Sequence, residues 1–179
     1  MTPSLIATRF GYGLPQPAGA PQSPTDMLAA LAGPDIAARD WPIDGLAVLQ
    51  PKLAQLREMK GAGRTDPALI PVYDKLLMDI AIATATAERS TIARALDAPD
   101  GFRERLVAFW ADHFTVVAKT KVESMLPYAL VEDAIRPHIT GRFSDLLIAV
   151  TLHPAMLNIW IKASLWGRIR FKANGRKRG

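Results

Sequence analysis

Residues 109–116 read FWADHFTV, a block that joins three large aromatic side chains to one histidine and one carboxylate. The block ends a stretch in which apolar side chains recur at helical spacing, namely Phe102, Leu106, Phe109 and Trp110. That spacing predicts an amphipathic helix, and Asp100 is a suitable N-cap for it. The sequence therefore places its densest group of chemically useful side chains at the carboxyl end of a helix.

The same spacing extends outward from this block in both directions. Toward the amino terminus it predicts a short helix after Ser23 and Pro24, with Met27, Leu28 and Leu31 as its apolar stripe. A second helix covers 46–56 and the longest runs from 66 to about 96. Toward the carboxyl terminus, helices are predicted over about 126–136, from 143 onward and again from 154. No stretch alternates as a strand, with 115–118 the one candidate for a short extended piece. We therefore predict an all-α, irregular helical domain.

Composition divides the chain into three parts. Residues 1–24 are rich in glycine and proline, and we predict an irregular arm that Phe10 and Tyr12 dock to the body. Residues 25–157 form the helical domain, and residues 158–179 form a basic tail. With 179 residues, 49% of them hydrophobic and 22% charged, the chain is long enough for one domain with its own core.

The net charge of +5 belongs to the tail. Residues 1–157 carry 15 basic and 17 acidic side chains, whereas residues 158–179 carry seven basic and no acidic ones. Because the charge is not spread over the domain, we predict no specific nucleic-acid-binding face. The absence of cysteine excludes disulfides and thiolate ligands, and we expect no cofactor.

His113 and Asp112 are the candidate catalytic residues. A histidine suits a metal ligand or a general base because its pKa lies near neutrality. Adjacent helical residues point about 100° apart, so the two side chains need not share a site. The alternative is that His113 is a structural histidine that interacts with the carbonyls and the dipole at a helix end.

Trp110 and Lys119 are the candidate ligand-binding residues. Trp110, with Phe109 and Phe114, is either a stacking surface for a ligand or part of the core. Lys119, with Lys121, is either an anion site or a pair of solvated loop charges. No catalytic serine triad, phosphate-binding loop or dinucleotide fingerprint is present.

The remaining histidines do not predict a metal site. His138 follows a helix end and His153 precedes Pro154 as a possible cap. A three-histidine site would need both to converge on His113, without the spacing that makes a zinc assignment specific. We therefore predict no metal site.

Two blocks carry a resemblance to a known family. They are residues 105–116, RLVAFWADHFTV, and residues 141–151, GRFSDLLIAVT, continued by HPAML at 153–157. With RFGYG at 9–13, residues 5–157 resemble the N-terminal portion of the bacterial family catalogued as domain of unknown function 1800. The resemblance implies a longer protein without an established activity. Family members often carry a second histidine where this chain has Ala111, so the resemblance does not support paired metal ligation here.

After HPAML the family typically continues with Tyr-Leu-Asp, a Gly-Pro-Asn segment and an Asn-Glu-Asn helix, and this chain does not. Back-translation from Asn158 without its first two nucleotides permits Tyr-Leu-Asp-Gln-Ser, followed later by Val-Gly-Pro-Asn. The codons at Trp160/Ile161 and Trp166/Gly167 force Asp and Gly, the residues that the family has at those points. We therefore expect residues 158–179 to be a frameshifted translation; the alternative is a genuine short protein with a basic tail.

Two functional hypotheses follow. In the first, the complete protein is an enzyme with a polar site between His113 and the missing Asn-Glu-Asn helix, and this chain alone is inactive. In the second, the chain is a helical scaffold or interaction module whose basic tail binds anions or nucleic acid.

The natural packing partner is then the missing C-terminal half of the same protein. Helices that pack against that half would expose apolar faces here, so we expect poor solubility of the isolated chain. No apolar run reaches the roughly 20 residues that span a bilayer, and no secretory signal is visible. We therefore expect a cytoplasmic protein without a membrane span.

Overall fold

The described part of the chain is mostly helical and contains no strand, which confirms the predicted all-α class. The computed structural model describes residues 3–14, 17, 19–59 and 61–157, so the predicted tail at 158–179 lies outside the described residues. The elements are α1 (Pro3–Phe10), α2 (Pro24–Ala32), α3 (Ile36–Asp40), α4 (Leu46–Met59), η1 (Ala62–Arg64), α5 (Ile70–Asp97), α6 (Gly101–His113), η2 (Lys121–Glu123), α7 (Leu126–Leu130), η3 (Val131–Ile135), η4 (Arg136–His138) and α8 (Phe143–Leu152). Across these elements, no helix has the length and apolar content to cross a membrane.

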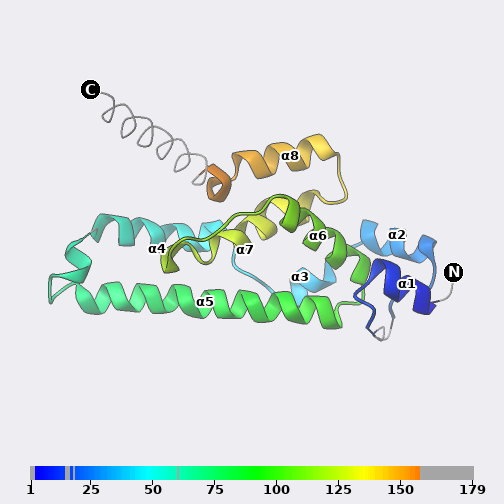
Figure 1. Cartoon of the computed structure of the whole chain (residues 1–179), viewed down its shortest axis with the longest axis horizontal. Helices are drawn as coiled ribbons and strands as arrows, with labels where there is room; N and C mark the ends of the chain where they lie inside the picture. Colours follow the sequence, from blue (N-terminus) through cyan, green and yellow to red (C-terminus); the bar gives the residue numbers. More distant parts are fainter. Residues whose placement is uncertain (1–2, 15–16, 18, 60, 158–179) are drawn as a thin grey trace, which may run out of the picture.

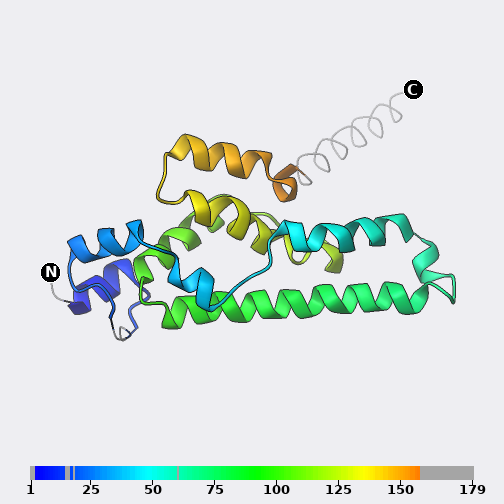
Figure 2. The same ribbon diagram turned by 180° about the vertical axis from the view of Figure 1, so that it is seen from behind.

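Helix α5, at 28 residues, forms one long edge of the molecule, and the other elements lie on one side of it (Figures 1 and 2). Its inner face packs with α4 and α7 around a first core, in which Leu49 and Ile80 are each only 1% exposed. A second core forms where α6 and α8 pack on η3, and there Ile135 and Val150 are 0% and 1% exposed. Two adjoining cores therefore hold the described residues together.

The predicted helix starts are confirmed at two capping residues. Ser23 Oγ accepts the Asp26 backbone N–H at 3.1 Å, and Asp100 Oδ1 accepts the Arg103 backbone N–H at 3.0 Å. These side chains satisfy donors that have no partner within the helix. Pro51 lies inside α4 without ending it.

The prediction of an irregular arm over residues 1–24 is wrong for its first part, because Pro3–Phe10 is helix α1. Ile6 and Phe10 lie one turn apart, Ile6 is 2% exposed, and the Phe10 ring meets Phe102 of α6 edge-on at 5.9 Å. Packing against α6 therefore stabilises a turn of helix that its composition did not suggest. The docking of Phe10 and Tyr12 is confirmed, since the Tyr12 hydroxyl donates to the Glu104 carbonyl at 3.4 Å.

Three further differences have local causes. The predicted helix at 126–136 is continuous but changes to a π-helical turn in η3 and a 3₁₀ turn in η4, since Pro137 lacks the N–H that an α-helix needs there. Residues 115–118 are irregular and form no strand. Leu28, assigned to an apolar stripe, is 64% exposed, while Met27 beside it is buried.

Candidate functional site

The block that dominates the sequence forms an aromatic cluster at the carboxyl end of α6. We define this aromatic cluster as Phe109, Trp110, His113, Phe114 and Phe143. Trp110 is central, with ring-centroid distances of 4.9 Å to Phe109, 5.7 Å to Phe114 and 5.5 Å to Phe143 of α8. The His113 ring meets Trp110 and Phe114 edge-on at 5.7 and 4.8 Å. The cluster therefore joins α6 to α8 and holds the histidine ring by aromatic contacts.

The aromatic cluster has a buried side and an exposed side. Trp110 is half-buried and packs against the second core, so it contributes to the apolar packing of the fold. Phe109 and Phe143 are 57% and 53% exposed, and His113 is exposed beside them. An exposed aromatic surface of this kind is suited to contact with a partner.

Asp112 and His113 are not joined as a catalytic pair in the described structure. His113 is the last residue of α6, and neither its ring nitrogens nor the Asp112 carboxylate makes a hydrogen bond or ion pair with any described residue. The helix-end carbonyls of Ala111 and Asp112 instead accept the Thr115 hydroxyl. Both candidate side chains are exposed. Neither is held in position by a hydrogen bond to a described residue, as the side chain of a general base normally is.

Lys119 lies on the exposed irregular segment that follows the aromatic cluster. Its backbone N–H donates to Glu123 Oε2 at 3.2 Å, which closes the loop before η2. No contact brings its ammonium group to Trp110 within the described residues, so the two candidate ligand-binding side chains are not assembled into one site.

The other two histidines have local structural partners. His138 Nδ1 lies 2.8 Å from the Ala134 carbonyl. His153 Nδ1 accepts the Ala155 backbone N–H at 3.2 Å, which confirms its capping role, and its Nε2 lies 3.3 Å from Asp133 Oδ2. Over residues 3–157 as described, no group of three or more histidine, aspartate or glutamate side chains could hold a metal ion.

The structure also contains a buried network of charged side chains, which the sequence did not predict. Arg136 Nη1 donates to Asp35 Oδ2 at 2.8 Å and to Glu104 Oε1 at 3.0 Å, and Nη2 donates to Glu104 Oε2 at 2.6 Å. Arg94 forms a two-pronged pair with Glu132 at 2.6 and 3.1 Å. Glu132 also lies 3.6 Å from Arg136 Nε, so the charges alternate in one chain from α5 to α3.

Two members of the network, Asp35 and Arg136, have shifted pKa values. Burial tends to raise the pKa of Asp35, but the hydrogen bond and the charge of Arg136 hold it below its ordinary value. Burial tends to lower the pKa of Arg136, and Glu104 and Asp35 outweigh it and raise that pKa. Asp35 and Arg136 are therefore both charged at neutral pH and paired with each other. Removal of one partner from such a buried pair is strongly destabilising, and carboxylates held in ion pairs are not free for acid–base chemistry.

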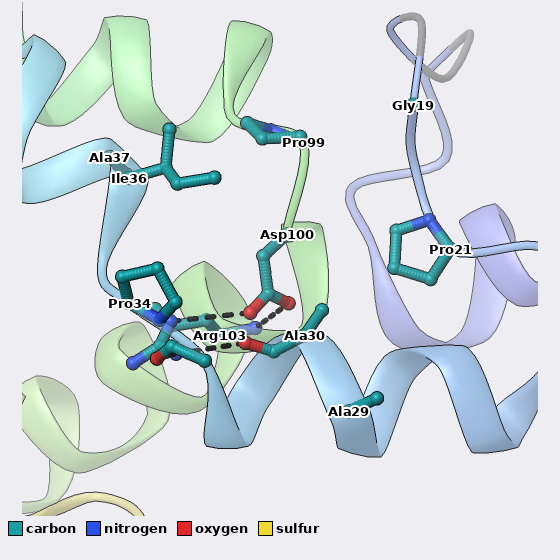
Figure 3. A pocket seen from close by; sticks show the side chains of 11 residues that line it. Gly19, Pro21, Ala29, Ala30, Pro34, Ile36, Ala37, Pro99, Asp100 and Arg103 are labelled. Carbon is teal, nitrogen blue, oxygen red and sulfur yellow. Dashed lines mark hydrogen bonds and ion pairs between the residues drawn. The ribbon is translucent and has the colours of Figure 1, made fainter.

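A small cavity lies beside a third buried arginine, Arg103 (Figure 3). Its volume is about 230 Å³, and its walls are mostly proline, alanine and glycine residues from the segment before α2, from α2 and α3, and from the segment before α6. Arg103 Nη2 donates to the carbonyls of Ala30, Leu31 and Gly33 at 3.1, 2.6 and 3.0 Å, and Nε lies 3.2 Å from Asp100. The guanidinium therefore closes the end of α2, and the cavity is a small apolar recess.

The comparison with known proteins that assigns the chain is a match between its sequence and a family. No curated protein matches it, and no solved structure matches it. Residues 6–159 match the family described as protein of unknown function (DUF1800). The match includes both the FWADHFTV block and helix α8, the two segments that build the aromatic cluster. The chain belongs to the DUF1800 family, whose function is not established.

Proposed function

We propose that this chain is the N-terminal helical part of a longer family protein, inactive alone, that presents the aromatic cluster and α8 to the polypeptide that follows. The observation that carries the proposal is the one-sided burial of α8. Leu146 and Val150 are 2% and 1% exposed, whereas Ile148 and Leu152 are 57% and 65% exposed. Figure 1 shows α8 standing at the outer edge of the fold, above η3.

The occupant we propose for this face is the segment encoded after Leu157 in the shifted reading frame. That frame permits Tyr-Leu-Asp-Gln-Ser and then Val-Gly-Pro-Asn, and only residues 153–157 separate its start from the end of α8. A segment tethered at that point reaches the exposed apolar side of α8 at little entropic cost, because the loop to be closed is short.

The residues present support a scaffold role best. Their buried charged groups are engaged in ion pairs within the fold, as the contacts of Arg94, Arg103 and Arg136 illustrate. Burial of Ile148, Leu152, Phe109 and Phe143 by a following segment would then supply apolar contact area, at about 25 cal/mol per Å² of surface removed from water.

A second candidate is an enzymatic site of the joined protein at His113. The observation that favours it is an exposed imidazole, ringed by aromatic side chains, whose nitrogens bond to no described residue. A polar helix packed over the aromatic cluster would bring such a ring into a partly buried site, where a neighbouring carboxylate could set its tautomer.

Reading the gene through codon 180 and expressing the frame-restored protein beside this chain tests the proposal. We expect an open shifted frame, and amide protons of α8 that exchange more slowly in the restored protein than in this chain. Leu152→Lys should then destabilise the restored protein, while Leu28→Lys, at an equally exposed residue of α2, should not. A shifted frame closed by stop codons, or α8 exchange unchanged by restoration, would contradict the proposal and make the basic tail a real segment.

The enzymatic candidate has its own readout. In the restored protein, His113→Ala should alter metal content or ligand-induced stabilisation while leaving the melting temperature unchanged. An effect of His113→Ala on stability alone would be consistent with the scaffold role and would contradict the enzymatic role.

A further inference from the structure

Helix α5 carries two apolar seams on opposite sides. The inner seam consists of Tyr73, Leu76, Ile80, Ala83, Ala87, Ser90 and Arg94. The outer seam consists of Met78, Ile82, Ala85, Arg89, Ile92 and Leu96. Both seams advance by alternating steps of three and four residues, which is the spacing that keeps side chains in line along a partner helix.

The inner seam is covered and the outer seam is not. In the outer seam Met78, Ile82, Ile92 and Leu96 are 61%, 57%, 59% and 51% exposed. Figures 1 and 2 agree that no described helix lies along this side of α5, although Ile82 also borders a hollow with Pro42 and Lys52, and Leu96 one with Tyr12 and Leu14. Single exposed apolar residues are ordinary. Four large ones in a single heptad register, on a helix whose opposite face is already buried, are typical of a helix that packs on both sides.

We propose that the outer seam is an interface between two copies of this chain, with their α5 helices packed antiparallel about Ala87. The seam is self-complementary in this arrangement. Met78 faces Leu96 of the second copy, Ile82 faces Ile92, and Ala85 faces Arg89. Reflection about position 87 therefore pairs each large apolar residue of the seam with another, as an isologous two-fold interface requires.

Charge and side-chain size determine the direction of the pair. A parallel, in-register pair would set Arg89 directly against Arg89, and like charges in contact are destabilising, whereas the antiparallel pair offsets the two arginines by four positions, about 6 Å along the axis. The antiparallel pair sets each Arg89 against the small Ala85, where the guanidinium has room and Glu88 of the second copy lies one turn away. Ala85 in the seam, with Ala81 and Ala93 on its two flanks, allows the two helices to approach closely.

The chain contains no cysteine, so single cysteines introduced into the seam report the geometry without background. A disulfide needs Cα atoms about 4.4–6.8 Å apart. In the antiparallel pair, position 82 meets position 92, whereas two copies of position 82 lie about 15 Å apart along the axis, at 1.5 Å per residue. Under a glutathione redox buffer, an equimolar mixture of Ile82→Cys and Ile92→Cys chains should form the mixed disulfide at least tenfold more than either chain forms its own homodimer.

Sedimentation equilibrium of the full chain supplies the second measurement. The double variant Ile82→Glu/Ile92→Glu should convert the dimer to monomer, because both residues are exposed in one copy and buried only in the pair. Leu28→Glu, at a residue exposed to a similar degree on α2, should leave the dimer intact.

Several outcomes would overturn the proposal. Homodimer disulfides that form in the same yield as the mixed disulfide would indicate that the two α5 helices meet in parallel or at random. A wild-type chain that stays monomeric at about 100 μM, weaker than most specific pairs, would exclude the dimer. Seam cysteines that are shielded from alkylation in the frame-restored protein, without forming the mixed disulfide, would show that another part of the same polypeptide covers the seam. Because these variants lie on α5 and those of the proposed function on α8, the two proposals fail separately.

Discussion

Arg136 Nη2 lies 2.6 Å from Glu104 Oε2, and the two side chains are only 5% and 6% exposed. The pair joins η4 to α6 across the interior, and the second nitrogen of the same guanidinium reaches Asp35 at the N-cap of α3. One side chain therefore fixes three segments that are distant in sequence. Its removal should cost far more than the loss of an exposed ion pair.

Glu104→Gln should lower the free energy of unfolding by about 3–5 kcal/mol, because it leaves a buried arginine without its closest counter-charge. Urea denaturation at neutral pH measures the loss. The matched control is Lys75→Ala, which removes an exposed pair with Asp79 and should cost less than about 1 kcal/mol. Arg136→Met should cost less in the Glu104→Gln background than in the wild-type chain, and additive effects in this double-mutant cycle would show that the pair is not coupled.

Asp35 should make stability depend on acid pH. Its pKa in the folded chain lies below the ordinary 3.8, so its stabilising contribution is fully present above about pH 4 and is lost as the pH falls through the folded pKa. Asp35→Asn keeps a good N-cap acceptor and removes the charge. The variant should therefore be destabilised at pH 6 and approach the wild-type chain near pH 2. A difference that is constant with pH would contradict this.

Gly45 has no room for a side chain, because a Cβ there would overlap Asp133 Oδ1. Gly45→Ala should displace Asp133 and cost about 1–3 kcal/mol by overpacking. The displacement also frees the Leu46 backbone N–H, which Asp133 Oδ2 accepts at 2.7 Å. Gly61→Ala is the control, since nothing lies within 4 Å of its Cβ position, and thermal melting of both variants makes the comparison.

Arg103→Lys should show that the planar guanidinium, and not its charge alone, closes the end of α2. A lysine keeps the charge but cannot serve three carbonyls and Asp100 together. We expect a loss of about 1–3 kcal/mol and faster amide exchange confined to α2. Arg105→Lys, at an exposed residue that donates to the Gly11 carbonyl, should change neither quantity measurably.

The helices were predictable where periodicity and capping act within one segment. Asp100 and Ser23 are recognisable as N-caps in the sequence. The buried face of α5 follows from the spacing of its apolar residues. Helix α1 was not predictable, since its stability comes from Ile6 and Phe10 packing on a helix that lies about 90 residues further along the chain. Tertiary contacts of this kind override weak local preferences.

The candidate site was predictable only in part. The contact of Trp110 with Phe109 and the terminal position of His113 follow from one helix, whereas the contact of Trp110 with Phe143 of α8 does not. The buried charges were missed because each partner lies on a different element. One signal was available, since Arg94 continues the inward seam of Tyr73, Ile80 and Ala87. A charged side chain in an apolar register indicates a buried partner.

The long-range contact between Leu46 and Asp133 has a consequence for biosynthesis. The two residues are 87 positions apart, so at roughly 5–20 residues per second the carboxylate is added on the order of 4–17 s after the helix that it caps. During that interval the Leu46 backbone N–H at the start of α4 lacks its acceptor. Arg94 likewise lacks Glu132, its ion-pair partner. A ribosome stalled before residue 132 should therefore carry a nascent chain that proteases cut readily, and protection should appear only when residues 126–138 leave the exit tunnel.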